Sequence, residues 1–287
     1  MGPTIAVALK WVPLHVEVDP LTGSVDADVR FAGSSAADRA ALEWALGLAE
    51  ATGGQVVAAT AGPADAEALL RDALAAGAHR AVRGAAPVDA PSEVVASVLA
   101  GAIGPVDLVC AGDHSLDRGS GSVPAFLAAE LGCAQALGLV RVELDPVASD
   151  AETGSVPSVT VRATRRLDHG RREVLRVEGP AVLSFEGGTA ELRRAPLAAV
   201  LAARTAAIEV TPWTGQPDPR VRVTRRAPYR PRPRALLPPA ADLTPRERIL
   251  SLTGALTDRT PPRTVVADTD EAATLVLDQL RAWGYLG

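Results

Sequence analysis

The chain has 287 residues, 47% of them hydrophobic and only 3% aromatic, so we expect a core built mainly from alanine, valine and leucine. Its formal net charge of −5 argues against a general nucleic-acid-binding protein. No apolar run approaches the roughly 20 residues that span a bilayer, and the first residues lack the basic leader of a signal peptide. Cys110 and Cys133 stand apart in apolar surroundings, which predicts reduced thiols in a cytoplasmic protein, without a disulfide or a metal site.

Apolar runs and amphipathic helical patterns alternate along the N-terminal part of the chain. Their periodicity predicts strands over 4–10, 55–61 and 81–82 and from 106 onward, with helices over 38–51, 63–76 and 92–103 between them. Strands separated by such helices form right-handed βαβ units, so we predict an α/β fold with a Rossmann-like parallel sheet and flanking helices. Ligands of these sheets bind beyond the carboxyl ends of the strands, which fall near Lys10, Gly62 and Asp113.

A loop rich in glycine, serine and aspartate follows the strand that begins near Val106 and precedes a helical pattern. Gly119 and Gly121 allow the backbone to approach an anion closely, and Ser120 and Ser122 offer hydroxyl donors. The loop has neither Gly-Lys-Ser/Thr nor G-x-G-x-x-G, so it is not a P-loop or a dinucleotide fingerprint. Two interpretations stand side by side: a phosphate site, or an ordinary strand-to-helix turn with a serine cap.

The pattern changes after about Val140. Residues 158–166 and 172–177 alternate in hydrophobicity around Leu167-Asp168-His169-Gly170, which predicts a β-hairpin. A strand over 180–185 and a helix over 196–204 follow.

Residues 220–234 are rich in arginine and proline, with Tyr229 as their single aromatic residue. We interpret this stretch as an extended linker; a nucleic-acid-binding segment is the second interpretation, although prolines and one aromatic ring make a poor stacking platform. Beyond it, capping motifs at Thr244 and Asp268 predict two helices. We therefore expect an α/β domain over 1–210, and over 211–287 a linker with a C-terminal helical extension that docks on a partner subunit.

Several segments, in order along the chain, resemble the β subunit of electron transfer flavoproteins. Residues 7–12 resemble the opening strand of that family, and 35–43 and 73–80 resemble two of its helical segments. The loop 116–123 occupies the place of the family's Ile-Asp-Gly-Asp-Thr-Gly-Gln-Val, and residue spacing within 163–184 follows the family signature. The tail is similar to an actinobacterial branch associated with mycofactocin systems.

This resemblance implies an adenine nucleotide alpha hydrolase-like fold and a heterodimer with an electron transfer flavoprotein α subunit. FAD would be held mainly by the α subunit against this chain, and AMP would be buried in this chain. The complex would carry electrons from a dehydrogenase to a quinone reductase or another acceptor, without direct membrane insertion. In family members that bifurcate electrons, a second FAD takes the place of AMP.

The resemblance also implies the positions of an adenine-nucleotide site at four places in the chain. The implied residues are Ala8, Ser35, Ala36, Ala37, Asp38, Ala61, Gly112, Asp113, His114, Ser115, Leu116, Asp117, Arg118, Gly119, Ser120, Gly121, Ser122 and Val123. Gly119, Ser122 and the Ser35–Ala37 segment depart from the family pattern, which has Asp, Gln and Asn-Pro-Phe there.

Small residues at strand ends, Ala8 and Ala61, would leave room for the base or the ribose. Asp38 either accepts from a ribose hydroxyl or caps the helix that it begins. Asp117 has the same charge as phosphate, so we expect it to hold the loop through backbone N–H groups. Arg118 either neutralises the phosphate or is an exposed surface arginine.

Two further residues are implied in contacts outside the nucleotide site. Leu197 falls where the family has a leucine that inserts into a pocket of partner dehydrogenases; without the resemblance, a leucine covering the core is favoured. His15 falls where the family's β chain faces the flavin, and a solvated loop histidine is the alternative.

Three functional hypotheses follow. The first is the electron transfer flavoprotein β subunit, which the resemblance implies is an electron carrier rather than an enzyme. The sequence fits this role, since it has no Ser/His/Asp arrangement and no metal-spaced cluster. The second is a stand-alone adenine-nucleotide sensor of the universal-stress-protein type. The third, an ATP-pyrophosphatase, requires a Ser-Gly-Gly-x-Asp-Ser loop that does not follow Lys10. The sequence leaves AMP, FAD or an empty site open.

Overall fold

The computed structural model describes residues 2–19, 21–145, 159–213, 224–225, 239–253 and 264–286. The chain divides into two compact units, Met1–Tyr229 and Arg230–Gly287. The predicted arginine- and proline-rich linker, apart from 224–225, lies outside the described residues. None of the described helices is long and apolar enough to cross a membrane.

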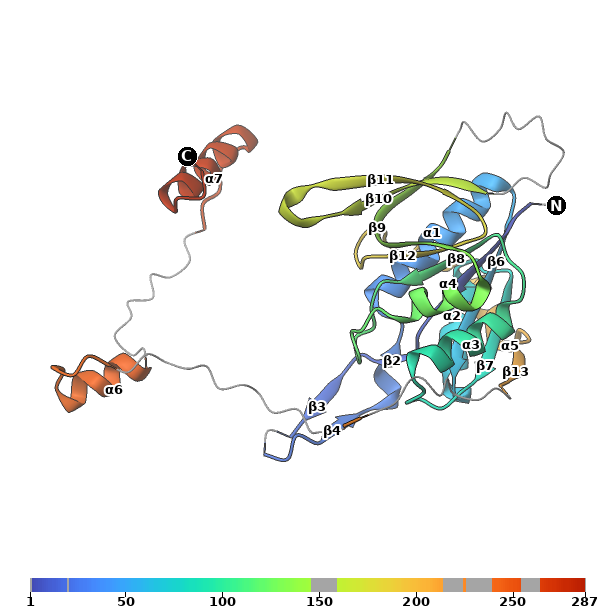
Figure 1. The fold of residues 1–287 in the computed structure, drawn as a ribbon, viewed down its shortest axis with the longest axis horizontal. Coiled ribbons are helices and arrows are strands. Elements are labelled where there is room, and N and C mark those ends of the chain that lie inside the picture. The colour runs from blue at the N-terminus through green and yellow to red at the C-terminus, as the bar shows by residue number, and fades with distance from the viewer. Residues whose placement is uncertain are drawn as a thin grey trace. The chain divides into compact units, whose positions relative to one another are not determined.

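A nine-stranded sheet forms the centre of the first unit in the part of the chain that the structure describes (Figure 1). Its order is β11-β10-β9-β12-β8-β1-β6-β7-β13. The strands are β1 (Thr4–Ala8), β6 (Gln55–Gly62), β7 (Arg80–Ala85), β8 (Leu108–Gly112), β9 (Ala134–Leu144), β10 (Thr160–Arg166), β11 (Arg172–Glu178), β12 (Ala181–Phe185) and β13 (Glu209–Pro212). Every neighbouring pair from β9 to β13 along this order is parallel, whereas β10 and β11 pair antiparallel at one edge.

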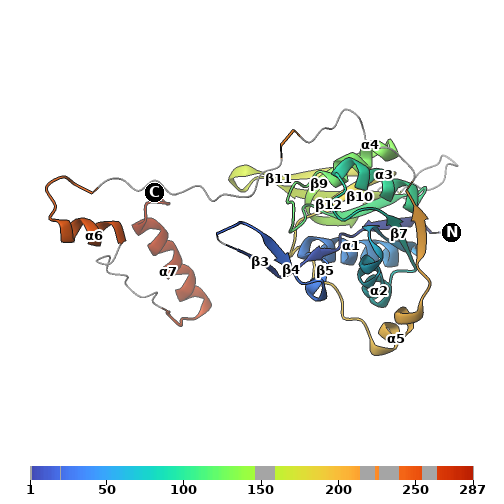
Figure 2. The ribbon, with the colours of Figure 1, turned by 90° about the horizontal axis from the view of Figure 1, so that it is seen from below.

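Helices cover both faces of the sheet and bury its alternating side chains (Figures 1 and 2). They are α1 (Ala36–Thr52), α2 (Glu67–Ala76), α3 (Ser92–Ile103), α4 (Val123–Leu131) and α5 (Leu197–Thr205). In β1, Ile5 and Val7 pack in one apolar cluster with α1 and α2, whereas Ala6 and Ala8 pack in another with α3 and α4. Because successive strand residues point to opposite faces, a strand buried on both sides reads as a continuous apolar run.

The fold confirms the predicted α/β class with a mostly parallel sheet, flanking helices and a β-hairpin. The hairpin β10–β11 turns at Asp168–Gly170, where His169 has a positive φ of 59°. The helix expected over 38–51 begins two residues earlier, and the one expected over 63–76 is divided into a 3-10 turn (Ala64–Ala66) and α2. Both cysteines are free, with Cys110 buried and Cys133 half-buried.

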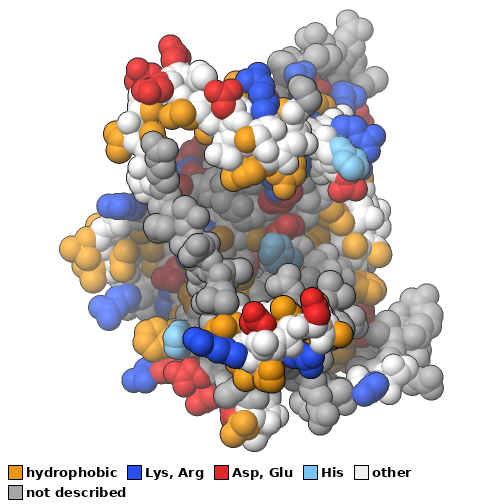
Figure 3. All heavy atoms as spheres, turned by 90° about the vertical axis from the view of Figure 1, so that its left-hand side faces the viewer, with side chains coloured by type: hydrophobic (Ala, Val, Ile, Leu, Met, Phe, Trp, Pro, Cys, Tyr) orange, Lys and Arg blue, Asp and Glu red, His pale blue; other side chains and the backbone are white. Residues whose placement is uncertain are grey.

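Several strands were not predicted. They are β9, β13, the short ribbon of β2 (Val12–Pro13) with β5 (Ala32–Gly33), and the ribbon of β3 (Val16–Val18) with β4 (Val25–Ala27). The turn at Asp19 connects β3 to β4, and the Asp19 carboxylate accepts the backbone N–H of Leu21 at 2.8 Å. Large apolar side chains on this ribbon, such as Val18 and Val25, are exposed. In Figure 3, hydrophobic side chains (orange) lie among charged ones (blue and red) over the coloured, described residues.

The second unit contains the two helices expected in the tail. In α6 (Pro245–Thr253), the Glu247 carboxylate accepts from the Thr244 backbone at 2.8 Å, as the capping motif predicts. In α7 (Thr269–Ala282), Asp268 accepts the backbone N–H groups of two first-turn residues. Docking of this unit on a partner stays a prediction.

Close packing between β7 and α3 should make Gly84 intolerant of a side chain. A Cβ at Gly84 would lie 2.2 Å from Cγ1 of Val98 and 3.3 Å from the Val98 carbonyl oxygen. We expect Gly84→Ala to lower the free energy of unfolding by about 1–3 kcal/mol, because the added methyl group overpacks this contact.

Chemical denaturation measures this difference, and Gly101→Ala on α3 is the matched control. A Cβ at Gly101 meets no atom within 4 Å, and the residue is exposed in a helix. There the same substitution should raise stability by about 0.5–1 kcal/mol. Equal effects at the two positions would contradict the packing argument.

Candidate functional site

An open cleft lies where the strand order of the sheet reverses. From β1 the chain continues to β6 and β7 on one side and then crosses to β8 on the other side. Crossovers that diverge in this way leave a crevice beyond the carboxyl ends of the strands. The cleft is open to solvent and is lined by the ends of β1, β6 and β8 and the starts of α3 and α4.

Asp38 connects the first turn of α1 to the end of β1. Its buried carboxylate accepts the backbone N–H of Lys10 at 3.2 Å. A Cβ at Gly112 would come within 2.5 Å of the Asp38 Oδ1, so the end of β8 can lie this close only with glycine there. Burial raises the pKa of Asp38 to about 6, against the opposing effect of its hydrogen bonds.

Helix capping by Asp38, one of its two predicted roles, is wrong. Ser35 is the N-cap of α1, and its hydroxyl accepts the backbone N–H of Asp38 at 3.0 Å. The side chain of Asp38 lines the cleft instead, so contact with a ribose hydroxyl stays a prediction.

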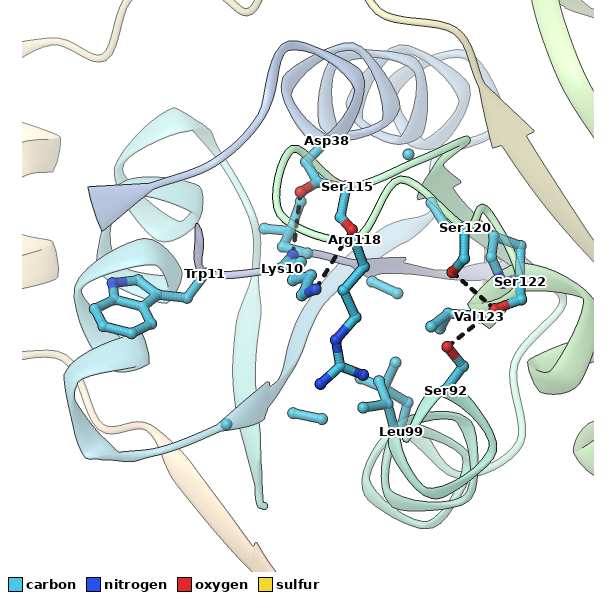
Figure 4. Close-up of a pocket in the computed structure, with 18 of the residues that line it drawn as sticks. Lys10, Trp11, Asp38, Ser92, Leu99, Ser115, Arg118, Ser120, Ser122 and Val123 are labelled. Carbon is cyan, nitrogen blue, oxygen red and sulfur yellow. Dashed lines mark hydrogen bonds between the residues drawn. The ribbon is translucent and has the colours of Figure 1, made fainter. Parts of the chain in front are cut away.

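Lys10 projects from the end of β1 and forms an ion pair with the glycine-containing loop. Its Nζ lies 2.6 and 2.7 Å from the two carboxylate oxygens of Asp117 and 3.4 Å from the Ser115 hydroxyl (Figure 4 labels Lys10 and Ser115). Burial acts to raise the pKa of Asp117, but its hydrogen bonds with Lys10 and Ser115 outweigh burial and lower it. Asp117 also accepts the backbone N–H of Arg118, as expected for a residue that holds the loop.

Three serine hydroxyls form a chain across the starts of two helices. Ser92 begins α3, Ser122 precedes α4, and their oxygens are 2.9 Å apart; Ser120 is 3.0 Å from Ser122 (Figure 4). The loop between β8 and α4 turns back closely here, because a Cβ at Gly121 would lie 2.7 Å from the carbonyl oxygen of Asp113. Gly121 also has a positive φ of 60°, which favours glycine. Hydroxyl donors and the N–H groups of two helix starts therefore face one region of the cleft.

Most of the predicted site residues line this cleft. They are Ala8, Asp38, Ala61, Gly112, Asp113, His114, Ser115, Arg118, Ser120, Gly121, Ser122 and Val123. The remaining residues of the same segments, Ser35, Ala36, Ala37, Leu116, Asp117 and Gly119, do not line it. Ser35 and Asp117 still contact residues that line the cleft: the Ser35 hydroxyl accepts the backbone N–H of Asp38, and Asp117 forms an ion pair with Lys10.

The structure adds residues that were not among the predicted site residues, although Lys10 was predicted to lie at the end of a strand. Lys10, Ser92, Val95 and Leu99 line the cleft, the last two as an apolar wall on α3. Lys10 is the only lysine in the chain and follows a predicted strand end, which is a signal that could have identified it. Ser92 gave no such signal, because a serine at a helix start is read as a cap.

Leu197 and His15 lie outside the cleft. Leu197 is 73% exposed at the first position of α5, so the alternative that it covers the core is wrong. The segment before it is held by Arg193, whose Nη2 lies 2.8 Å from Oε1 of Glu43. His15 is exposed and packs edge-on against Phe31 at a ring distance of 6.0 Å.

The fold and the position of the cleft define a Rossmann-like α/β protein with its candidate site at the sheet's switch point. A family model described as the electron transfer flavoprotein domain matches residues 32–214. The chain belongs to the electron transfer flavoprotein family, as a protein of the β-subunit type, and is therefore part of an electron carrier rather than a catalytic enzyme.

Individual relatives agree with this family. The chain is 31% identical over 221 residues to "Protein FixA" of Bradyrhizobium diazoefficiens, which covers 73% of each chain. It is 31% identical over 147 residues to "Electron transfer flavoprotein subunit beta" of Thermoanaerobacterium thermosaccharolyticum, covering 49% of this chain and 56% of that protein.

A universal stress protein solved in complex with cAMP is 26% identical and covers 45% of this chain and 90% of its own, with a TM-score of 0.27. The family match favours the first of the three functional hypotheses.

The raised pKa of Asp38 makes a testable contribution to stability. A folded-state pKa of about 6 lies above the ordinary value of 3.8, so the folded state holds the proton more tightly than the unfolded state. The resulting stabilisation is complete below about pH 4 and is lost as pH rises to about 6. Asp38→Asn removes the titration and keeps an acceptor oxygen for the Lys10 N–H.

We expect the stability of the native protein, relative to Asp38→Asn, to fall by about 2 kcal/mol between pH 4 and pH 7. Urea unfolding at several pH values measures this difference. Gly101→Ala on α3 is the control: a Cβ there meets no atom within 4 Å and no titratable group is changed, so its effect on stability should not vary with pH. A pH-independent difference for Asp38→Asn would contradict the assignment.

Proposed function

We propose that this chain is the β subunit of a heterodimeric electron transfer flavoprotein and that its cleft binds AMP. The chain pairs with an α subunit, helps to hold FAD at the interface between the two, and acts in the cytoplasm. Electrons pass through the complex from a flavin- or redox-cofactor-dependent dehydrogenase to a downstream acceptor. Family membership supports the electron-transfer role, and the cleft at the switch point carries the nucleotide proposal.

The cleft has the chemistry that an adenine nucleotide requires. Small residues, Ala8 and Ala61, lie at the strand ends, and Leu99 adds apolar surface against which a purine can pack. The serine hydroxyls and helix starts around Ser122 offer donors to a phosphate group. Because Gly121 has no Cβ, its backbone can lie close to the carbonyl oxygen of Asp113, and this tight turn keeps the donors close together.

The residues around the cleft supply binding and orientation rather than reaction chemistry. FAD, when bound, would supply the redox chemistry of the complex. Within the described ranges, no group of three or more histidine, cysteine or acidic residues is placed to hold a metal ion. In this proposal the chain contributes a nucleotide site and a surface for its partners.

Purification of the full-length chain together with any protein that copurifies with it tests the proposal. We expect a yellow complex of two different chains, because a bound flavin absorbs in the visible range. Acid extraction followed by mass spectrometry should release both FAD and AMP. A second equivalent of FAD without AMP would support the electron-bifurcating alternative, and a colourless protein without any adenylate would contradict the proposal.

We propose that Leu197 contacts the dehydrogenase that reduces the complex. It is exposed at the start of α5, with Val200 and Leu201 exposed one turn further along the helix. Burial of one leucine in a partner's pocket is worth about 1.5–3 kcal/mol. Leu197→Ala should therefore raise the KM for the dehydrogenase roughly tenfold, and the absorption spectrum of the bound flavin should not change.

Stopped-flow reduction of the flavin by the dehydrogenase measures this effect. Leu167→Ala, at the exposed tip of the β10–β11 hairpin, is the control and should transfer electrons normally. Unchanged kinetics for Leu197→Ala would remove Leu197 from the docking surface.

A further inference from the structure

Arg118 extends across the cleft from one wall to the other. It belongs to the loop that follows β8, and its Nη1 donates to the carbonyl oxygen of Ala90 at 2.7 Å. Ala90 lies in the segment that precedes α3, on the wall opposite the loop. Figure 4 shows the Arg118 side chain passing between the Lys10 side of the cleft and the serine side. Arg118 is exposed, as the surface-arginine alternative expects, but its guanidinium is bound to Ala90 and the residue lines the cleft.

Arg118 and Lys10 differ in whether a carboxylate neutralises their positive charge. Lys10 is paired with Asp117 at 2.6 Å. Asp113 is within 2.7 Å of the His114 ring. Among the described residues, no carboxylate lies within ion-pair distance of Arg118, whose remaining N–H groups are free to donate. Within the described part of the cleft, Arg118 is therefore a cation that is not already neutralised.

The loop 116–123 carries one arginine, Arg118, and one carboxylate, Asp117, which is already paired with Lys10. The Ser92 and Ser122 hydroxyls, also on the cleft wall, add neutral donors without adding charge.

We propose that Arg118 is a specificity-determining residue that matches the cleft to a single phosphate group. Its guanidinium binds the phosphate of a nucleoside monophosphate through charge-assisted hydrogen bonds. Because the side chain spans the cleft, it also restricts the space into which a pyrophosphate-linked second half would extend. AMP is then bound in preference to adenosine, which lacks the charge, and to FAD, which is longer. This inference rests on the proposed nucleotide function of the cleft.

Displacement of radiolabelled AMP from the full-length complex tests the proposal, because it reports on this cleft and not on a flavin site elsewhere. The competitors are unlabelled AMP, adenosine and FAD. For the native protein, we expect unlabelled AMP to displace half of the tracer at a concentration at least about tenfold lower than adenosine does. FAD should also require a higher concentration than AMP.

The substitution Arg118→Ala should weaken AMP about tenfold or more and leave adenosine unchanged, and the preference for AMP over FAD should shrink. Arg118→Lys keeps the charge without the planar fork, so its affinity for AMP should be intermediate. Arg172→Ala is the matched control, since it removes an exposed arginine on β11 that does not line the cleft. If Arg118→Ala binds AMP too weakly to hold the radiolabelled tracer, isothermal titration calorimetry with AMP, adenosine and FAD gives the same ratios of affinity.

The possible outcomes distinguish a failure of the role of Arg118 from a failure of the nucleotide site. If AMP binds to the native protein and the ratios among AMP, adenosine and FAD are the same in Arg118→Ala, the role of Arg118 is wrong and the nucleotide site stands. If FAD binds more tightly than AMP to the native protein, the match to one phosphate is wrong. If no adenylate binds to the native protein, both the nucleotide site and the role of Arg118 are overturned.

Discussion

The buried carboxylate of Asp38 is the contact on which the geometry of the cleft depends. It accepts the Lys10 backbone N–H at the end of β1, and it lies where a side chain at Gly112 would stand at the end of β8. One residue of α1 thus sets the spacing of two adjacent strand ends at the switch point. Burial disfavours the charged form of this carboxylate, so the arrangement is maintained against a cost in stability at neutral pH.

The loop after β8 is held on both walls of the cleft by two neighbouring residues. Asp117 pairs with Lys10 on the β1 side, and Arg118 donates to Ala90 on the α3 side. The first contact neutralises a cation, whereas the second leaves a guanidinium with donors to spare. The same loop can therefore be rigidly placed and still present positive charge to a ligand, which suits a site that binds and orients rather than reacts.

Side-chain hydrogen bonds also fix the short helix α5 near both of its ends. Arg71 on α2 donates to the carbonyl oxygens of Ala203, Arg204 and Ala206 at the end of α5, at 2.9 to 3.1 Å. Arg193 bonds Glu43 ahead of the helix, which raises the pKa of the Arg193 guanidinium. The apolar side chain of Leu197 is thus presented from a well-anchored helix, although few of its own neighbours cover it.

Local patterns in the sequence by themselves determined the fold class, most helices and the sheet's central strands. Apolar runs such as 4–8 are buried from both sides whatever the register, and Ser92–Ile103 forms a helix over the predicted residues. Only the tertiary structure decided β9 and β13, whose pairing partners β12 and β7 lie far away along the chain. The same holds for the cleft: Lys10, Ser92 and Arg118 come from three separate segments, and their chemistry appears only when the crossovers bring those segments together. Hydrophobic periodicity is a property of neighbouring residues, whereas charge pairing across a cleft depends on distances that no single segment contains.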